Sequence, residues 1–185
     1  MANIMSTSVQ IKNLNEETFG KLMELLPINE NEKYYVDVDS HLKSLYGDEW
    51  DGEFAYDWMT SKIGAKWINI DGPEREFDPE LNLFIESAWS VPSGWLEKLT
   101  EFLTNIDPAI VLVGTYEDES QDPMGAFVYG HNYDDMEDMD IELDYDRWWD
   151  DDEYRDEVFA ELNSLKENLY EGYLDTMADR KEEQE

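Results

Sequence analysis

Residues 133–157 are the feature that most constrains how this chain can fold. The segment reads YDDMEDMDIELDYDRWWDDDEYRDE, with 14 carboxylates against two arginines and a local net charge of −12. Like charges at this density repel one another and keep a segment unfolded unless apolar residues hold it in place. Such residues are interleaved with the acids here: Met136, Met139, Ile141, Leu143, Tyr145, Trp148, Trp149 and Tyr154. The segment can therefore pack against a scaffold and hold its carboxylates in a fixed array.

The rest of the composition supplies a scaffold. Of the 185 residues, 41% are hydrophobic and 14% aromatic, which indicates one folded domain, or one domain plus an appended helix. The net charge of −34 is far beyond what solubility needs, and its self-repulsion lowers stability. There is no cysteine, which excludes disulfides, zinc–thiolate sites and thiol catalysis.

The charge is distributed unevenly. Residues 1–115 carry a net charge of −13, whereas residues 116–185 carry −21 over only 70 residues. Adaptation to high salt is expected to spread acids over the whole surface. The skew therefore favours a dedicated acidic face, and it leaves a halophilic source open as an alternative.

The N-terminal residues predict a cytoplasmic chain. MANIMSTSVQIKN has neither the basic start nor the apolar core of about 7 to 15 residues that a secretion signal needs. No apolar run approaches membrane-spanning length. The negative charge also disfavours direct binding to anionic membranes and to nucleic acid, because both would repel the chain.

Hydrophobic alternation, and one continuous apolar run at residues 109–116, predict five strands. They lie at residues 8–13, 66–70, 81–88, 109–116 and 125–131. The second and third strands are expected to form a hairpin through the turn Asp-Gly-Pro at residues 71–73.

Helical spacing of apolar residues predicts three main helices. The first begins after Asn15, a favourable N-cap residue, and ends at Pro27. The second follows Ser90 or Ser93 as a candidate cap and stops before residue 108. The third runs from residue 158 to about residue 180. Between the first two, residues 28–62 read as an insertion with short helices near 40–46 and 54–62.

This order of elements predicts an α+β fold. Strand, helix, two strands, helix and strand in succession is the ferredoxin-like arrangement, an antiparallel sheet with its helices on one face. The sequence then predicts two units. Residues 1–131 form the ferredoxin-like domain with its insertion, and residues 132–185 form the acidic segment and a long helix packed on it.

Three stretches of the first unit resemble a phage-borne ferredoxin-like family of the Api type. They are IGAKWINI at residues 63–70, LFIESAWSVPSGWLEKL at 83–99 and YEDESQDPMGAFVYG at 116–130. The resemblance covers about residues 8–131. It implies a ferredoxin-like fold and an origin on a mobile element, and it transfers no active site. The chain departs from the family in its charge and in everything after residue 130.

The pattern of acids disfavours an enzyme. General acid–base and two-metal chemistry use a few carboxylates in a pocket, whereas these run continuously along one segment. The two histidines, His41 and His131, fall in different predicted elements and lack the spacing of a metal site. Each is predicted to be an ordinary surface or strand-end residue.

A calcium loop is the nearest metal-binding alternative. Asp140, Glu142, Asp144 and Asp146 alternate as in an EF-hand loop. However, Tyr145 stands where that loop needs glycine, and Asp151 replaces the bidentate glutamate. The sequence predicts loose attraction of divalent ions, and neither a specific metal site nor a cofactor.

The aromatic residues Trp148, Trp149 and Tyr154 allow two interpretations. As core residues they would pin the acidic segment to the following helix. As exposed residues they would be interaction hot spots, for which Trp and Tyr are favoured.

Dense, ordered carboxylates predict a strongly basic partner, and large basic clefts belong mostly to proteins that bind nucleic acid. Duplex DNA carries one charge per about 1.7 Å of its axis, and a helix advances about 1.5 Å per residue. A segment with more than half its residues acidic can approach that density. The leading hypothesis is thus a DNA mimic of phage origin that blocks a host defence complex, as an anti-CRISPR or anti-restriction protein.

Two other hypotheses stay open. One is an acidic adaptor or chaperone that sequesters a basic host protein, and the other is a halophilic housekeeping domain. For the leading hypothesis, the candidate partner-binding residues are Asp134, Asp135, Glu137, Asp138, Asp140, Glu142, Asp144, Asp146, Trp149, Asp150, Asp151, Asp152, Glu153, Asp156 and Glu157.

Overall fold

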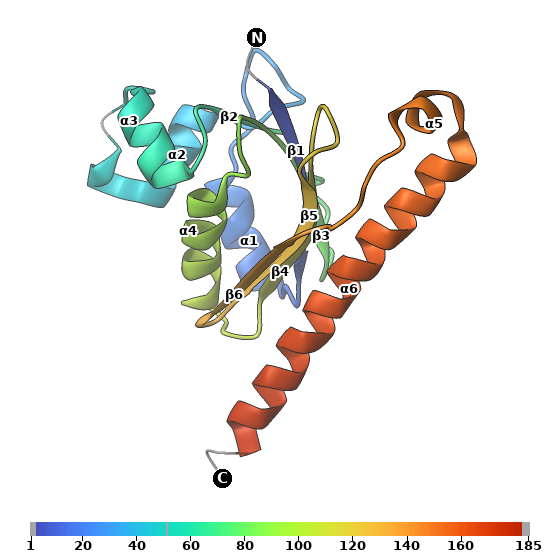
Figure 1. Cartoon of the computed structure of the whole chain (residues 1–185). Coiled ribbons are helices and arrows are strands. Elements are labelled where there is room, and N and C mark those ends of the chain that lie inside the picture. The colour runs from blue at the N-terminus through green and yellow to red at the C-terminus, as the bar shows by residue number, and fades with distance from the viewer. Residues whose placement is uncertain (1–2, 51, 183–185) are drawn as a thin grey trace.

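The computed structural model describes residues 3–50 and 52–182, and its centre is a six-stranded antiparallel sheet with strand order β2-β3-β1-β4-β5-β6 (Figure 1). The strands are β1 (Ile4–Lys12), β2 (Ile68–Ile70), β3 (Leu81–Ala88), β4 (Val111–Asp118), β5 (Met124–Gly130) and β6 (Tyr133–Asp138). The prediction of an α+β fold with an antiparallel sheet is confirmed, and so is the pairing of β2 with β3.

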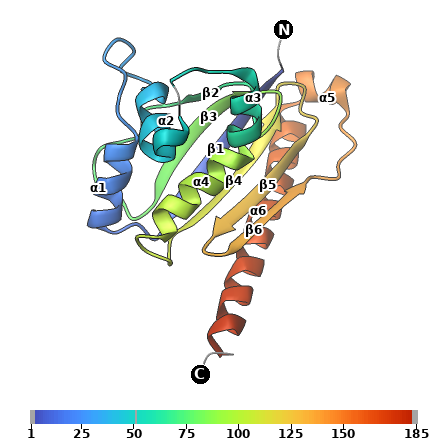
Figure 2. The same ribbon diagram turned by 90° about the vertical axis from the view of Figure 1, so that its left-hand side faces the viewer.

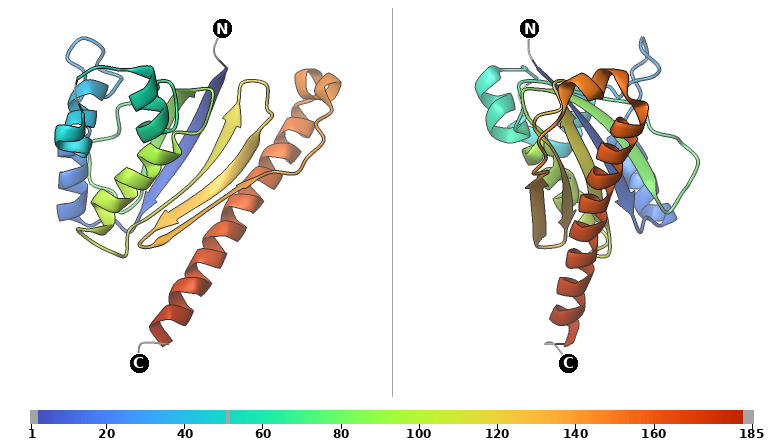
Figure 3. Two further views of the ribbon diagram at one scale, coloured as in Figure 1. Left: turned by 60° about the vertical axis from the view of Figure 1, so that its left-hand side comes forward. Right: turned by 45° about the vertical axis from the view of Figure 1, so that its right-hand side comes forward.

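Helices cover both faces of this sheet. They are α1 (Glu16–Leu25), α2 (Val38–Tyr46), α3 (Tyr56–Trp58), α4 (Ser93–Thr104), α5 (Tyr145–Asp150) and α6 (Asp152–Glu182). A 3-10 turn, Gly47–Glu49, follows α2, and a π-helical turn, Met59–Ile63, follows α3. Figures 1 and 3 show α1 and α4 on one face and α6 crossing the other. The chain thus has three layers.

The buried side chains lie between these layers. The main core lies between the sheet and helices α1, α2 and α4, and it includes Val9 and Ile11 of β1, whose alternation predicted that strand. A second cluster lies between α6 and β4–β5, where Val128 packs near Leu169 and Tyr173. Every residue of β5 is buried, because this strand has a helix over each face.

The predicted cap of α1 is confirmed, whereas that of α4 is wrong. Asn15 Oδ1 accepts hydrogen bonds from the backbone N–H groups of Glu17 and Thr18, and Thr18 Oγ1 accepts one in return from the Asn15 N–H. At α4 the N-cap position is Pro92, which has no side chain able to cap. Ser90 donates its hydroxyl to the Gly64 carbonyl instead.

The sheet continues beyond the expected boundary at residue 131. The β6 strand pairs with β5 along its whole length, from Gly130↔Tyr133 to Gly125↔Asp138. The first part of the acidic segment is therefore an edge strand of the sheet, which the sequence did not predict. The long C-terminal helix was predicted, and it begins at Asp152, six residues before the predicted start.

The prediction for His41 is wrong, because its side chain is completely buried. The Leu25 carbonyl accepts a hydrogen bond from His41 Nδ1 at 2.7 Å, and Trp95 Nε1–H donates to His41 Nε2 at 2.7 Å. Only the neutral ring with its proton on Nδ1 satisfies both contacts. His131, in contrast, lies exposed directly after β5, as predicted.

This geometry predicts an acid-sensitive core. Burial lowers the pKa of His41 from 6.5 to about 4, so the neutral ring contributes stability above pH 6.5 that is lost as the pH falls toward 4. We expect the wild type to lose about 2 kcal/mol of its stability advantage over His41→Gln between pH 7 and pH 5. Urea unfolding of both proteins at the two pH values measures this, because carboxylate effects are common to both. An unchanged difference between the two proteins would contradict the assignment.

Candidate protein-binding surface

The acids of β6 project from both faces of an edge strand. Their register with β5 places Asp134, Met136 and Asp138 on the face of α4, and Asp135 and Glu137 on the face of α6. All five are exposed. Figure 2 shows β6 at the rim of the sheet, with α6 behind it.

One of these acids is held from within the protein. The hydroxyl of Tyr116 in β4 donates to Asp138 Oδ1 at 2.5 Å across the small residue Gly125. Burial, and then this hydrogen bond, raise the pKa of Tyr116. A Cβ at Gly125 would lie 2.3 Å from the Tyr116 hydroxyl, so glycine is needed for this contact.

The segment 139–144 alternates strictly between inward apolar and outward acidic residues. Met139, Ile141 and Leu143 are half-buried against a small cluster of Met124, Trp148 and Val158. The intervening residues, Asp140, Glu142 and Asp144, are exposed. The apolar interleaving noted in the sequence therefore acts as expected, since it anchors the segment and turns its carboxylates outward.

The two adjacent tryptophans have different environments. Trp148 is 4% exposed and packs edge-on against Phe159 with 5.6 Å between ring centroids, whereas Trp149 is 68% exposed. Trp148 is thus a core residue that fixes α5 on α6. Trp149 stands in solvent beside the acids.

Asp151 differs from the other predicted binding residues. Its Oδ1 accepts the Tyr154 N–H at 3.0 Å, and its Oδ2 accepts two hydrogen bonds from Arg147 at 2.9 and 3.1 Å. The bond from Tyr154, followed by the contact with Arg147, lowers the pKa of Asp151. Asp151 is half-buried and serves the start of α6, while all other predicted partner-binding residues are exposed.

The outward side of α6 carries a further row of acids that the sequence analysis missed. Its inward side is apolar, with Val158, Leu162, Leu169 and Tyr173 buried. The missed outward residues, all exposed, are Glu161, Glu167, Glu171, Asp175 and Asp179. Four of them are spaced by four residues, so they form one stripe. This spacing was readable in the sequence beside the apolar stripe that predicted the helix.

The basic residues of α6 neutralise this side only in part. Arg155 donates to the Trp148 carbonyl at 2.7 Å and pairs with Asp152. Arg180 donates to the Asn132 carbonyl at 3.3 Å, and Lys166 forms an ion pair with the outward Glu167 at 3.3 Å. With Lys181, these four cations stand against ten acids in α6, so the helix keeps a net charge of −6.

We call the exposed carboxylates of β6, segment 139–144, α5 and the outward side of α6 the acidic face. The acidic face extends around the β6 edge toward α4, because Asp134 of β6 and Glu97 of α4 both lie near Tyr129. Burial first, and then these two charges, raise the pKa of Tyr129. Like charges at neighbouring i,i+4 positions each destabilise a helix by about 0.2–0.5 kcal/mol, so the arrangement lowers the stability of the chain.

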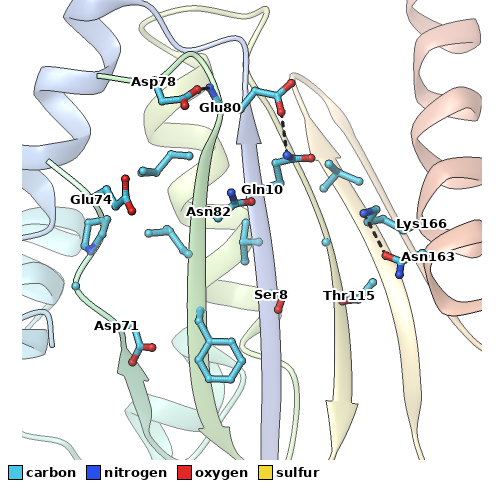
Figure 4. A pocket seen from close by; sticks show the side chains of 18 of the residues that line it. Ser8, Gln10, Asp71, Glu74, Asp78, Glu80, Asn82, Thr115, Asn163 and Lys166 are labelled. Carbon is cyan, nitrogen blue, oxygen red and sulfur yellow. Dashed lines mark hydrogen bonds between the residues drawn. The ribbon is translucent and has the colours of Figure 1, made fainter. Parts of the chain in front are cut away.

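A separate groove lies on the open part of the sheet between α6 and residues 71–80 (Figure 4). It has a volume of about 710 Å³. Ser8, Gln10 and Asn82 line its floor, and Gln10 Nε2 donates to Glu80 Oε2 at 2.9 Å. Its amides and hydroxyls can bind a polar ligand, while its five acidic lining residues and single lysine disfavour a phosphate group.

Within residues 3–50 and 52–182, no group of three or more His, Asp or Glu residues could hold a metal ion. The EF-hand-like run therefore does not converge on one point. In the same described part of the chain, no helix is long and apolar enough to cross a membrane.

Comparisons with protein-family models, with curated proteins and with solved structures find no match to this chain. The function is therefore argued from the acidic face and its geometry.

Proposed function

We propose that this chain is a DNA mimic that occupies the basic DNA-binding cleft of a host defence complex, a CRISPR effector or a restriction enzyme. The observation that carries the proposal is the excess of negative charge on α6 and around it. The helix carries ten acids against four bases, of which Arg155 and Lys166 pair with Asp152 and Glu167, so most of its exposed carboxylates are left for a partner. Such an acidic face is drawn into a cleft lined by Lys and Arg, and it has no phosphodiester to cleave.

The charge density of α6 alone falls short of that of duplex DNA. Eight outward acids of α6 lie between Glu153 and Asp179, which is one per about 5 Å of helix axis. Duplex DNA presents one per about 1.7 Å. The helix alone is too sparse, and the carboxylates of β6, segment 139–144 and α5 make up part of the difference.

The proposal includes a phage or other mobile-element origin and action in the cytoplasm of the host cell. It also takes the part from β1 to β4 as a ferredoxin-like core of the Api type. The support for this fold is the order β1, α1, β2, β3, α4 and β4, with α2 and α3 inserted between α1 and β2, together with the sheet order β2-β3-β1-β4, in which the two helix-connected units interleave. The proposed role is binding, without catalysis or cofactor, because the acids are numerous and almost all exposed to solvent.

Competition with DNA tests the function. A labelled duplex bound to a purified CRISPR effector or restriction enzyme should be released by this chain, as measured by fluorescence anisotropy. The inhibition constant should rise at least about tenfold between 0.1 and 0.5 M salt, because the Debye length falls below about 5 Å. Binding of the basic protein without release of DNA would indicate the adaptor or chaperone instead. A gel shift of DNA by the chain alone would contradict the proposal.

Circular dichroism provides the control for the halophilic alternative. A phage inhibitor that works in an ordinary host must be folded near physiological ionic strength, whereas a halophilic domain of this charge is expected to unfold when salt is removed. Spectra in dilute buffer and at molar salt should therefore coincide. A fold that forms only at molar salt would support the halophilic domain.

A further inference from the structure

The outer edge of β6 is unpaired along its whole length. Within the described chain β6 pairs with β5 alone, and Asp134, Asp135, Met136, Glu137 and Asp138 are all exposed. At the end of this ladder the Met139 N–H donates to the Met124 carbonyl at 2.8 Å. Antiparallel pairs alternate between bonded and non-bonded residues, so the backbone groups of Asp134, Met136 and Asp138 point outward.

The opposite edge of the sheet is short and covered at one end. The β2 strand is only three residues long, and residues 34–36 pair with its end, at residues 70–72. There the Val36 N–H donates to the Ile70 carbonyl at 2.9 Å, and the Gly72 N–H donates to the Tyr34 carbonyl at 2.7 Å. The β2 edge is thus paired in part with backbone of the same chain, whereas the β6 edge is unpaired and carries acidic side chains.

Those charges decide what can pair with the open edge. A second copy of β6 would bring carboxylates opposite carboxylates on both faces of the strand, which disfavours self-pairing. An extended segment with Lys or Arg at alternate positions would bring cations opposite the acids on one face of the strand. Met136, 36% exposed at the middle of the strand, offers a central apolar contact.

We propose that β6 binds an extended, lysine- or arginine-bearing segment of the partner as a seventh strand of the sheet. The inference rests on the proposed function, since it assigns how a basic partner contacts the acidic face. Backbone hydrogen bonds then define the register of the partner segment, and the acids select its charge.

Two synthetic peptides of equal charge test this proposal. One alternates lysine and threonine and is long enough to span β6; the other has proline in place of every threonine, so it cannot pair as a strand. With the first peptide, hydrogen exchange at the outward amides of Asp134, Met136 and Asp138 should slow at least about tenfold, and binding should be at least about tenfold tighter than with the second.

A matched pair of variants localises the effect. Met136→Pro removes one outward N–H and keeps every bond to β5, and Met136→Leu keeps all of them. Met136→Pro should bind both peptides with the same affinity, whereas Met136→Leu should behave as the wild type. Exchange at Tyr133, Asp135 and Glu137 reports whether β6 stays paired with β5 in each variant.

The outcomes separate the two proposals. Equal binding of both peptides by the wild type, without slower exchange at the outward amides, would overturn the seventh strand and leave the acidic face intact as a binding surface. If neither peptide binds at low salt, the acidic face does not attract cationic partners and the proposed function falls with it.

Discussion

Neutralising four outward carboxylates at the end of α5 and in the first turns of α6 should weaken inhibition of the target complex about 100-fold. The variant carries Asp150→Asn, Glu153→Gln, Asp156→Asn and Glu157→Gln, which leaves the helix-capping Asp151 in place. If each exposed carboxylate contributes about 0.7 kcal/mol against a basic cleft, the four together contribute about 2.8 kcal/mol, or two orders of magnitude in affinity. Competition with labelled DNA, at one fixed salt concentration, measures the loss.

The matched control removes four charges elsewhere. Glu30, Glu32, Glu74 and Glu76 are exposed in loops outside the acidic face, and their replacement by Gln should change the inhibition constant less than about threefold. Both variants should be as stable as the wild type or more so, since each relieves self-repulsion. Equal inhibition by the two variants would remove the acidic face from the mechanism.

Replacing Trp148 with alanine should lower the free energy of unfolding by about 3–5 kcal/mol, because it empties the cluster that joins α5 to α6. Trp149→Ala is its neighbouring control and should change stability by less than about 0.5 kcal/mol, since that ring is in solvent. Urea denaturation of the two variants gives both numbers.

The effect on binding is expected to distinguish the Trp148 and Trp149 variants in the opposite sense to the effect on stability. Trp149→Ala should weaken inhibition while the fold stays unchanged, as expected of an exposed aromatic anchor among charges. Comparable losses of stability in both variants would mean that the two rings share the core, against the geometry of α5.

Patterns local in the sequence predicted much of this fold. The alternation of Val9 and Ile11 predicted β1, Asn15 predicted the start of α1, and the three- and four-residue steps from Val158 to Tyr173 predicted α6. Each pattern depends on residues within one element, so it can be recognised in a single sequence.

The predictions that were wrong or absent concern residues whose environment depends on contacts between distant elements. His41 is neutral and buried because Leu25 and Trp95, from α1 and α4, supply its hydrogen-bonding partners, and no spacing around residue 41 shows this. Strand β6 was hidden by its composition, since Asp and Glu are poor strand formers and pairing with β5 overrides that preference.

The candidate surface was predicted in part. Its acids between residues 134 and 157 were named from composition, and in the structure all but Asp151 are exposed. Sequence alone could not assign Trp148 and Trp149, because adjacent helical residues are related by about 100° and either could face the core. The row from Glu161 to Asp179 was overlooked because its charge density is lower than that of the segment before it.

The division of α6 into an apolar inner side and an acidic outer side has an evolutionary consequence. The inner residues, such as Leu162 and Tyr173, must fit the surfaces of β4 and β5, so a change of shape there is costly. For the proposed binding role only the sign of the charge matters on the outer side, so Asp and Glu could replace one another or move by one position. We expect the outer side to drift quickly among descendants of this chain while the inner stripe persists, so that relatives would share a spacing of apolar residues more than an identity of acids.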